Sequence, residues 1–133
     1  MIVDTSVIAA ILLDEPERKH LQVMLASSGR NQMSAGSWIE LAVVLFRKDK
    51  DELVDISERL LVTFSIEIAA VDLRQSEIAR EAYRRFGRGS GHRAKLNFGD
   101  CFSYALAKAA NQPLLFKGDD FTHTDVLKAI ENA

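Results

Sequence analysis

The chain has 133 residues, of which 47% are hydrophobic and 27% charged, and its formal net charge is −2. These values predict one globular domain over residues 1–133 and argue against a general DNA coat protein, which would be strongly basic. No apolar run is long enough for a membrane span and residues 1–4 lack the features of a signal peptide, so we expect a cytoplasmic protein with no membrane contact.

Short apolar stretches alternate with longer segments that have the apolar spacing of helices. In chain order they predict a strand at 2–3, helices at 6–13 and 17–26, a strand at 32–34, a helix at 37–47, a helix that ends near 62, a strand at 64–71, a helix at 73–86 capped by Asp72, a helix at 98–110 and a strand at 114–116. The last strand is fully apolar, which is typical of a buried central strand.

Strands that alternate with helices predict an α/β fold with a mostly parallel sheet covered on both faces. Ligands of such sheets bind beyond the carboxyl ends of the strands. Asp4 and Asp119 both follow short hydrophobic strands, so we expect both carboxylates at that edge. Asp4, Thr5 or Ser6 has a second interpretation, as a cap of the first helix.

Two more acids lie at the start of later helices. Glu40 interrupts the otherwise apolar stretch 38–46, where a buried carboxylate needs a metal ion or a base as its partner. Asp100 lies three residues after Asn97, a spacing that predicts a helix cap with an acid in the first turn. The helix N-terminus would keep Asp100 ionised and able to bind a cation. Four carboxylates from separate elements are suitable ligands for Mg²⁺, and they predict a metal-dependent phosphodiesterase.

A cluster of cationic residues lies between Glu81 and Asp100, in a stretch with three glycines and no acid. Flexible basic loops suit a polyphosphate backbone, although a solvated surface is an equally good interpretation of the composition. The cluster consists of Arg84, Arg85, Arg88, Arg93 and Lys95.

Four stretches in series resemble the PIN domains, and among them the VapC toxins of bacterial toxin–antitoxin modules. The stretches are MIVDTS at 1–6, SWIE at 37–40, LNFGDC at 96–101 and PLLFKGDDF at 113–121. The resemblance implies a three-layer α/β/α fold in which Asp4, Glu40, Asp100 and an acid of the last stretch hold Mg²⁺ or Mn²⁺. We assign Asp119 as that acid and keep Asp120 as its alternative, because Gly118 occupies the position where many relatives have an acid.

The resemblance further implies an endoribonuclease whose cation polarises the phosphoryl group and lowers the pKa of a bound water. Thr5 or Ser6 would contact phosphate, and the five cationic side chains would contact the RNA backbone. A structured RNA with an exposed loop, such as tRNA, is the expected substrate. A cognate VapB antitoxin that blocks the site and a toxin homodimer are also implied. We expect the helix that carries Trp38 and Leu45 to contribute to these contacts.

Two other functional classes remain open. A phosphoacceptor receiver domain would use Lys117 and an aspartate at the end of a central strand, whereas the available Asp49, Asp51 and Asp55 lie in polar, helix-like sequence. A non-catalytic binding module would keep the fold and cleave nothing, but it would have no reason to bury Glu40.

Overall fold

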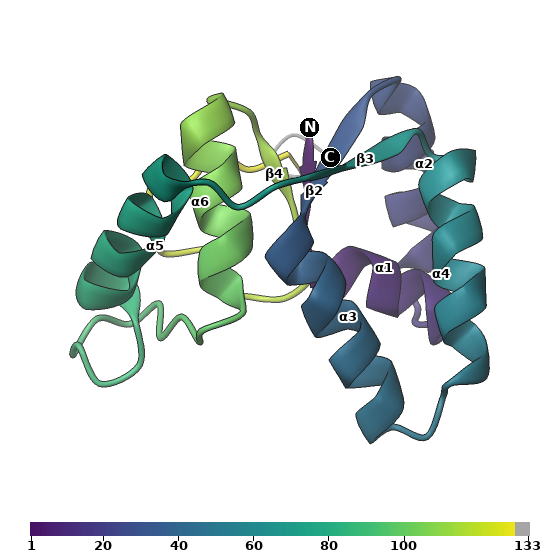
Figure 1. Ribbon diagram of the computed structural model, residues 1–133, viewed down its shortest axis with the longest axis horizontal. Coiled ribbons are helices and arrows are strands. Elements are labelled where there is room, and N and C mark those ends of the chain that lie inside the picture. Colours follow the sequence, from purple (N-terminus) through teal and green to yellow (C-terminus); the bar gives the residue numbers. More distant parts are fainter. Residues whose placement is uncertain (130–133) are drawn as a thin grey trace.

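Four parallel strands form the middle layer of the protein in the order β3-β2-β1-β4 (Figure 1). In the computed structural model, which describes residues 1–129, the elements are β1 (Ile2–Val3), α1 (Thr5–Leu12), α2 (Arg18–Ser28), β2 (Asn31–Ser34), α3 (Ala35–Arg47), α4 (Glu52–Thr63), β3 (Ile66–Ala69), α5 (Leu73–Phe86), α6 (Asp100–Ala110) and β4 (Leu114–Leu115). Every predicted strand and helix is present in the predicted order, with small shifts at the ends. No helix among these residues is long and apolar enough to cross a membrane.

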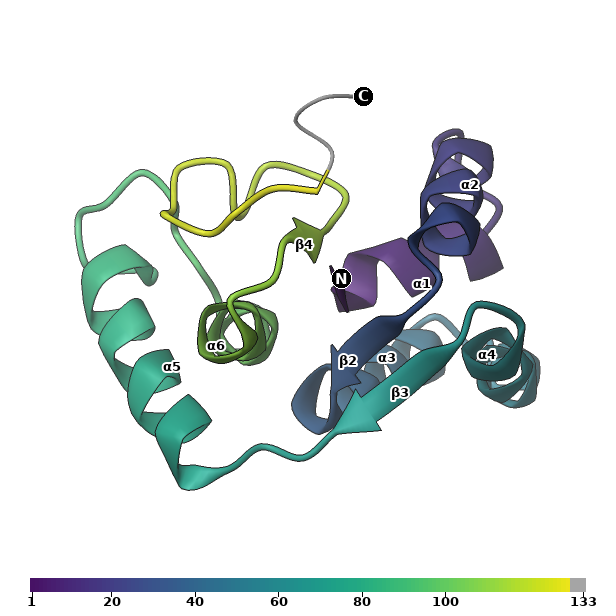
Figure 2. The same ribbon diagram turned by 90° about the horizontal axis from the view of Figure 1, so that it is seen from above.

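Helices cover both faces of the sheet, which confirms the predicted three layers (Figure 2). Neighbouring side chains of a strand point to opposite faces. Ile2 and Leu114 accordingly pack in the core with α5 and α6, whereas Val3 and Leu115 pack in the core with α1 to α4. Both cores therefore contain a residue from each of the paired strands β1 and β4.

The predicted central position of β4 is wrong, because this strand lies at one edge of the sheet, next to β1. Its side chains are nevertheless fully buried. The chain after residue 126 covers the outer side of β4: the Leu114 N–H donates to the Leu127 carbonyl at 2.8 Å, and the Ala129 N–H donates to the Leu114 carbonyl at 3.0 Å. This cover explains why an edge strand has the apolar composition of a central one.

Side-chain caps start three helices at the carboxyl edge of the sheet. The Asp4, Ser34 and Asp72 side chains accept hydrogen bonds from backbone N–H groups in the first turns of α1, α3 and α5, which confirms the predicted cap at Asp72. Such caps satisfy donors that have no partner within the helix. Asp4 directly follows β1 and Ser34 ends β2, so α1 and α3 begin at the edge where an α/β fold binds its ligands.

The segment after β4 carries Asp119 and Asp120, and contacts with α6 hold it in place. The Tyr104 hydroxyl donates to the Asp125 carboxylate at 2.5 Å, and the Lys108 ammonium lies 3.3 Å from the same carboxylate. Phe121 is buried and packs edge-on against Phe116, with ring centroids 5.2 Å apart. The two aspartates therefore belong to a segment with fixed anchors on both sides.

We predict that Tyr104→Phe lowers the free energy of unfolding by about 1.5 kcal/mol, because it removes a hydrogen bond to a charged group. Urea unfolding followed by circular dichroism measures this difference. Tyr83→Phe is the matched control, since the Tyr83 hydroxyl on α5 forms no hydrogen bond with any other residue in 1–129 and its side chain is partly exposed. Equal effects of the two substitutions would contradict the role of Tyr104 as an anchor.

Candidate active site

Asp4 is a buried carboxylate that receives three hydrogen bonds at the end of β1. The Ser6 N–H and hydroxyl donate to Oδ2 at 3.0 and 2.7 Å, and the Ser103 hydroxyl of α6 donates to Oδ1 at 2.5 Å. The Ser6 hydroxyl also accepts from the Lys117 N–H just after β4, at 3.0 Å. The cap at Asp4 is thus confirmed, and the same carboxylate lies between the ends of β1, β4 and α6.

Asp100 is buried at the start of α6 in a reciprocal pair with Asn97. The Asp100 N–H donates to the Asn97 side-chain oxygen at 2.8 Å, and the Asn97 N–H donates to the Asp100 carboxylate at 3.0 Å, which confirms the predicted cap. Burial raises the pKa of Asp100 from its ordinary 3.8 to about 7; the Asn97 hydrogen bond opposes this rise, and the charges of Asp4, Asp120 and Glu40 add to it.

Burial therefore opposes the expected effect of the helix N-terminus on the ionisation of Asp100 in the metal-free protein. A helix N-terminus at the surface stabilises a negative charge by about 0.3 to 1 kcal/mol, whereas one unit of pKa corresponds to about 1.4 kcal/mol. The rise in the pKa of Asp100 spans several such units. Loss of hydration outweighs the helix dipole at this position.

Glu40 reaches from α3 toward the start of α6. Its carboxylate lies directly against Gly99, where a Cβ atom would overlap it, so the glycine permits this approach. Burial raises the pKa of Glu40; the nearby Thr5 hydroxyl opposes this rise, and the charges of Asp4 and Asp120 add to it. The half-buried Glu40 therefore shares an electrostatic environment with Asp4 and Asp100.

The fourth carboxylate in this environment is that of Asp120. Its charge raises the pKa of both Glu40 and Asp100, whereas Asp119 is not among the charges that act on either group. Both aspartates are exposed and follow Gly118, whose φ of 98° turns the chain sharply after β4. These charge effects favour Asp120 over Asp119 as the fourth member of the carboxylate cluster, which we define as Asp4, Glu40, Asp100 and Asp120.

Two buried serines support the cluster, and sequence reasoning missed both. Ser103 lies three residues after Asp100, on the same face of α6, and its hydroxyl is 2.9 Å from the Ser37 hydroxyl of α3. The Ser37 carbonyl accepts a hydrogen bond from the Thr5 hydroxyl at 3.0 Å. The i, i+3 spacing from Asp100 was the available signal, but a serine in a helix seldom attracts notice by itself.

The donor set of the cluster suits a hard divalent cation. Its four members offer only carboxylate oxygens, and none of them forms an ion pair with a cationic side chain of residues 1–129. Buried carboxylates without such a partner gain from a bound cation. The ligand set is not preassembled, because no three Asp, Glu, His or Cys side chains in the described part of the chain are gathered closely enough to hold one ion.

The five cationic residues of the predicted RNA-binding cluster fall into two groups. Arg84 pairs with Glu81 on the surface of α5. Arg85 lies 3.9 Å from the Asp125 carboxylate and 4.6 Å from the centre of the Phe86 ring. The other three, Arg88, Arg93 and Lys95, line a cavity together with Asp119 and Asp120. Only this second group adjoins the carboxylate cluster.

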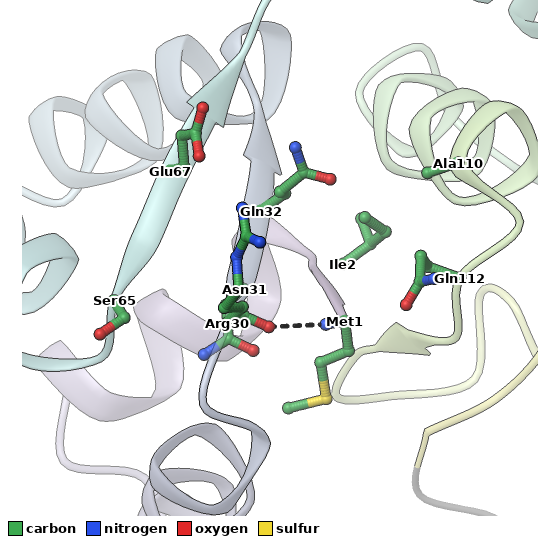
Figure 3. Close-up of a pocket in the computed structure, with 9 residues that line it drawn as sticks. All are labelled: Met1, Ile2, Arg30, Asn31, Gln32, Ser65, Glu67, Ala110 and Gln112. Atoms are coloured by element: carbon green, nitrogen blue, oxygen red, sulfur yellow. Dashed lines mark hydrogen bonds between the residues drawn. The ribbon is translucent and has the colours of Figure 1, made fainter.

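A separate cavity of about 540 Å³ lies at the amino ends of the strands, on the opposite edge of the sheet (Figure 3). Its wall includes Gln32, Glu67 and Gln112, and the amino group of Met1 beside it donates to the Arg30 carbonyl at 2.9 Å. Among residues 1–129, its lining contains one carboxylate, that of Glu67, and no second acid for paired chemistry. The candidate active site is therefore at the carboxyl edge.

The PIN domain family model matches residues 1–127. The chain belongs to the PIN-domain family. This PIN domain is 48% identical over 129 residues to ribonuclease VapC42 of Mycobacterium tuberculosis, covering 97% of the chain and 98% of the relative. It is 46% identical over 126 residues to ribonuclease VapC of Mycolicibacterium smegmatis, covering 95% and 97%. The VapC-type resemblance inferred from the sequence is confirmed.

Solved structures share the fold of this PIN domain at low sequence identity. VapC20 of Mycobacterium tuberculosis, described as a Sarcin-Ricin loop cleaving toxin, superposes with a TM-score of 0.77 at 17% identity over 96% of both chains. VapBC2 from Rickettsia felis, bound to a DNA fragment from its promoter, gives a TM-score of 0.72 at 15% identity over 96% and 94%. The receiver-domain alternative is wrong, because no strand end carries the available aspartates. Asp49 lies in the connection between α3 and α4, and Asp51 and Asp55 lie at the start of α4 and within it; all three are exposed.

We predict that Asp100→Asn stabilises the metal-free PIN domain at pH 8. The pKa of Asp100 is higher in the folded than in the unfolded protein, so the wild type loses stability as the pH rises from about 4 to about 7 and stays at the lower value above that. Asparagine avoids this loss and still accepts the Asn97 hydrogen bond. The gain should be at least about 1.4 kcal/mol, the equivalent of one pKa unit.

Thermal melts in EDTA at pH 8 and pH 5 measure this difference, which should shrink at the lower pH. Asp119→Asn is the matched control, because the charge of Asp119 does not act on Asp100. A gain for Asp100→Asn that is the same at both pH values would contradict the raised pKa.

Proposed function

We propose that this PIN domain is a metal-dependent endoribonuclease, the toxin of a VapBC-type toxin–antitoxin module. One observation carries the proposal: the end of β1, the second turn of α3, the start of α6 and the segment after β4 bring four carboxylates into one electrostatic environment, and no cationic side chain of residues 1–129 pairs with them. The names of the relatives, ribonuclease VapC42 and ribonuclease VapC, support the same activity over nearly the whole chain.

Asp4 and Asp100 are the proposed primary ligands of Mg²⁺, for which Mn²⁺ can substitute. Glu40 and Asp120, the latter in place of Asp119, complete the set directly or through water. A bound cation would polarise the scissile phosphoryl group and lower the pKa of a water molecule. The Ser103 hydroxyl orients the Asp4 carboxylate, and Gly99 leaves the space that Glu40 occupies.

The hydroxyls of Thr5 and Ser6 are the proposed contacts to the substrate phosphate. In the free protein they bond to the Ser37 carbonyl and to Asp4, so a phosphate would have to share or replace these bonds. A carboxyl with a pKa near neutrality, as in Asp100, can also accept or release a proton at physiological pH, until a bound cation lowers that pKa.

We propose a structured RNA with an exposed single-stranded loop, such as tRNA, as the substrate, because specific protein contacts to RNA favour unpaired bases. The description of VapC20 as a toxin that cleaves the Sarcin-Ricin loop supports an RNA loop as the target class. Such a substrate would be met in the cytoplasm.

A VapB-type antitoxin is the proposed partner, supported by the toxin–antitoxin complexes among the structural neighbours. Helix α3 offers three exposed apolar side chains, Ile39, Val43 and Phe46, on the face away from the core that buries Leu45. Contacts of α3 with an antitoxin or with a second toxin subunit would therefore use these residues. A homodimer is proposed on the family resemblance.

We predict that the purified PIN domain, free of antitoxin, cleaves tRNA into discrete fragments with Mg²⁺ and not with excess EDTA. Asp100→Asn and Asp120→Asn should slow cleavage by about a hundredfold or more, as loss of one electrostatic group does in other active sites. Asp119→Asn should retain most of the activity. Gel analysis of labelled tRNA and total RNA measures the rates. Folded, metal-loaded protein that cleaves neither RNA would instead support a non-catalytic binding module.

We predict that Mg²⁺ or Mn²⁺ raises the melting temperature of the wild type, because a ligand of the folded state stabilises it by about 1.4 kcal/mol at ten times its Kd. Asp100→Asn should respond much less at the same metal concentration, and Asp119→Asn should respond like the wild type. Differential scanning calorimetry at several metal concentrations makes the comparison. A wild type that neither Mg²⁺ nor Mn²⁺ stabilises would contradict metal binding by the carboxylate cluster. Identical shifts in all three proteins would show that the cation binds elsewhere.

A further inference from the structure

A cavity of about 970 Å³ lies between the loop that joins α5 to α6 and the segment that follows β4. The first wall, which we call the basic loop (residues 87–97), contributes Arg88, Arg93 and Lys95. The second wall contributes Asp119 and Asp120. Because Asp120 lines this cavity and also belongs to the carboxylate cluster, the cavity adjoins the candidate active site.

Backbone hydrogen bonds close the base of the basic loop. The Leu96 N–H donates to the Phe86 carbonyl at 2.8 Å, and the Arg88 N–H donates to the Leu96 carbonyl at 3.0 Å. Nearer the tip, His92 Nδ1 accepts from the Ala94 N–H at 3.0 Å, and its ring packs edge-on against the Phe86 ring with 4.9 Å between centroids. These contacts give the loop a defined shape before any ligand binds.

The second half of the loop alternates between buried and exposed residues. Ala94 and Leu96 are buried in the core with α5 and α6, whereas Arg93 and Lys95 are exposed. The apolar residues therefore act as anchors, and the cationic residues between them are held at the rim of the cavity. This pattern differs from that of a charged tail, whose cations have no fixed position.

The five residues of the predicted RNA-binding cluster differ in their acidic partners. No carboxylate of residues 1–129 forms an ion pair with Arg88, Arg93 or Lys95. The other two, Arg84 and Arg85 at the end of α5, are already engaged, Arg84 with Glu81 and Arg85 with Asp125 and the Phe86 ring. Among these five residues, the loop cations are therefore the ones available to an anionic ligand in this cavity.

We propose that this cavity is a subsite for a backbone phosphate of the RNA, adjacent to the phosphodiester that is cleaved. Arg88, Arg93 and Lys95 bind this phosphate, and Arg84 and Arg85 do not. Guanidinium groups bind phosphate oxygens through paired hydrogen bonds, and three cations on one wall outnumber the two carboxylates on the other. The identity of the ligand rests on the proposed ribonuclease function, whereas the division between the two sets of cations rests on the contacts described above.

Binding of RNA in EDTA tests the subsite without cleavage. Fluorescence anisotropy would follow a labelled oligouridylate of roughly 12 nucleotides over a series of salt concentrations. The test variant is Arg88→Ala with Arg93→Ala, and the matched control is Arg84→Ala with Arg85→Ala, which removes the same number of the same side chain. Gel analysis after each titration shows that the oligonucleotide is intact.

Each contact to a single-stranded phosphate contributes about 0.7 to the slope of log K against log salt concentration. The double substitution Arg88→Ala with Arg93→Ala should therefore reduce this slope by about 1.4 and the affinity for RNA at low salt by at least about tenfold. The control substitution Arg84→Ala with Arg85→Ala should leave both quantities close to those of the wild type. An equal loss in the two variants would show a diffuse charge effect and overturn the proposal. No loss in the loop variant would overturn it as well.

The outcome is independent of the cleavage assay. If only the loop variant weakens RNA binding and the wild type cleaves no RNA, the phosphate subsite stands and the ribonuclease function is refuted. If the wild type cleaves RNA but the two variants weaken binding equally, the ribonuclease function stands and the phosphate subsite is refuted. If the loop pair lowers the melting temperature, Lys95→Ala alone gives the same test, with an expected slope change of about 0.7.

Discussion

A buried carboxylate without a cationic partner must be stabilised by hydrogen-bond donors, and Asp4 imposes this requirement on the whole carboxyl edge of the sheet. Ser6 and Ser103 supply the donors, from α1 and from α6. Each is bonded onward, Ser6 to the Lys117 N–H after β4 and Ser103 to Ser37 of α3. One small network thus fixes the relative positions of the elements that carry the other three acids.

The nearest lysine to this network does not neutralise the acids. The Lys117 backbone takes part in the network, but its ammonium group turns to Glu15 and Glu17 in the connection between α1 and α2. Burial and the charges of the neighbouring carboxylates consequently raise the pKa of Asp100 and of Glu40. This is a cost in stability for the protein alone, and it is the condition under which an external cation is bound most favourably.

Local sequence signals were sufficient wherever a structure depends on neighbours in the chain. The cap at Asp72 and the reciprocal pair of Asn97 and Asp100 follow from spacing within one turn of helix. The burial of β4 at the edge of the sheet depends on residues 127–129, which fold back beside it, and nothing near residue 114 indicates this.

Contacts between residues far apart in the chain distinguish the alternatives that the sequence left open, namely the identity of the fourth acid and the roles of the arginines. Asp119 and Asp120 are neighbours that the sequence does not separate, and only in the folded protein does the charge of Asp120 act on Glu40 and Asp100. The division of the arginines depends on partners in other elements in the same way, because Arg85 meets Asp125 across 40 residues of sequence.

The strand order has a consequence for the synthesis of the protein. β1 is made before the other three strands of the sheet, yet it lies between β2 and β4, and Ile2 pairs with Gln32 on one side and with Leu114 on the other. The Ser103 hydroxyl that holds Asp4 is 99 residues away in the chain. A ribosome-bound chain therefore exposes Asp4 and Glu40 long before Asp100 and Asp120 have emerged, so the complete acidic site can form only after the segment that follows β4 has been made.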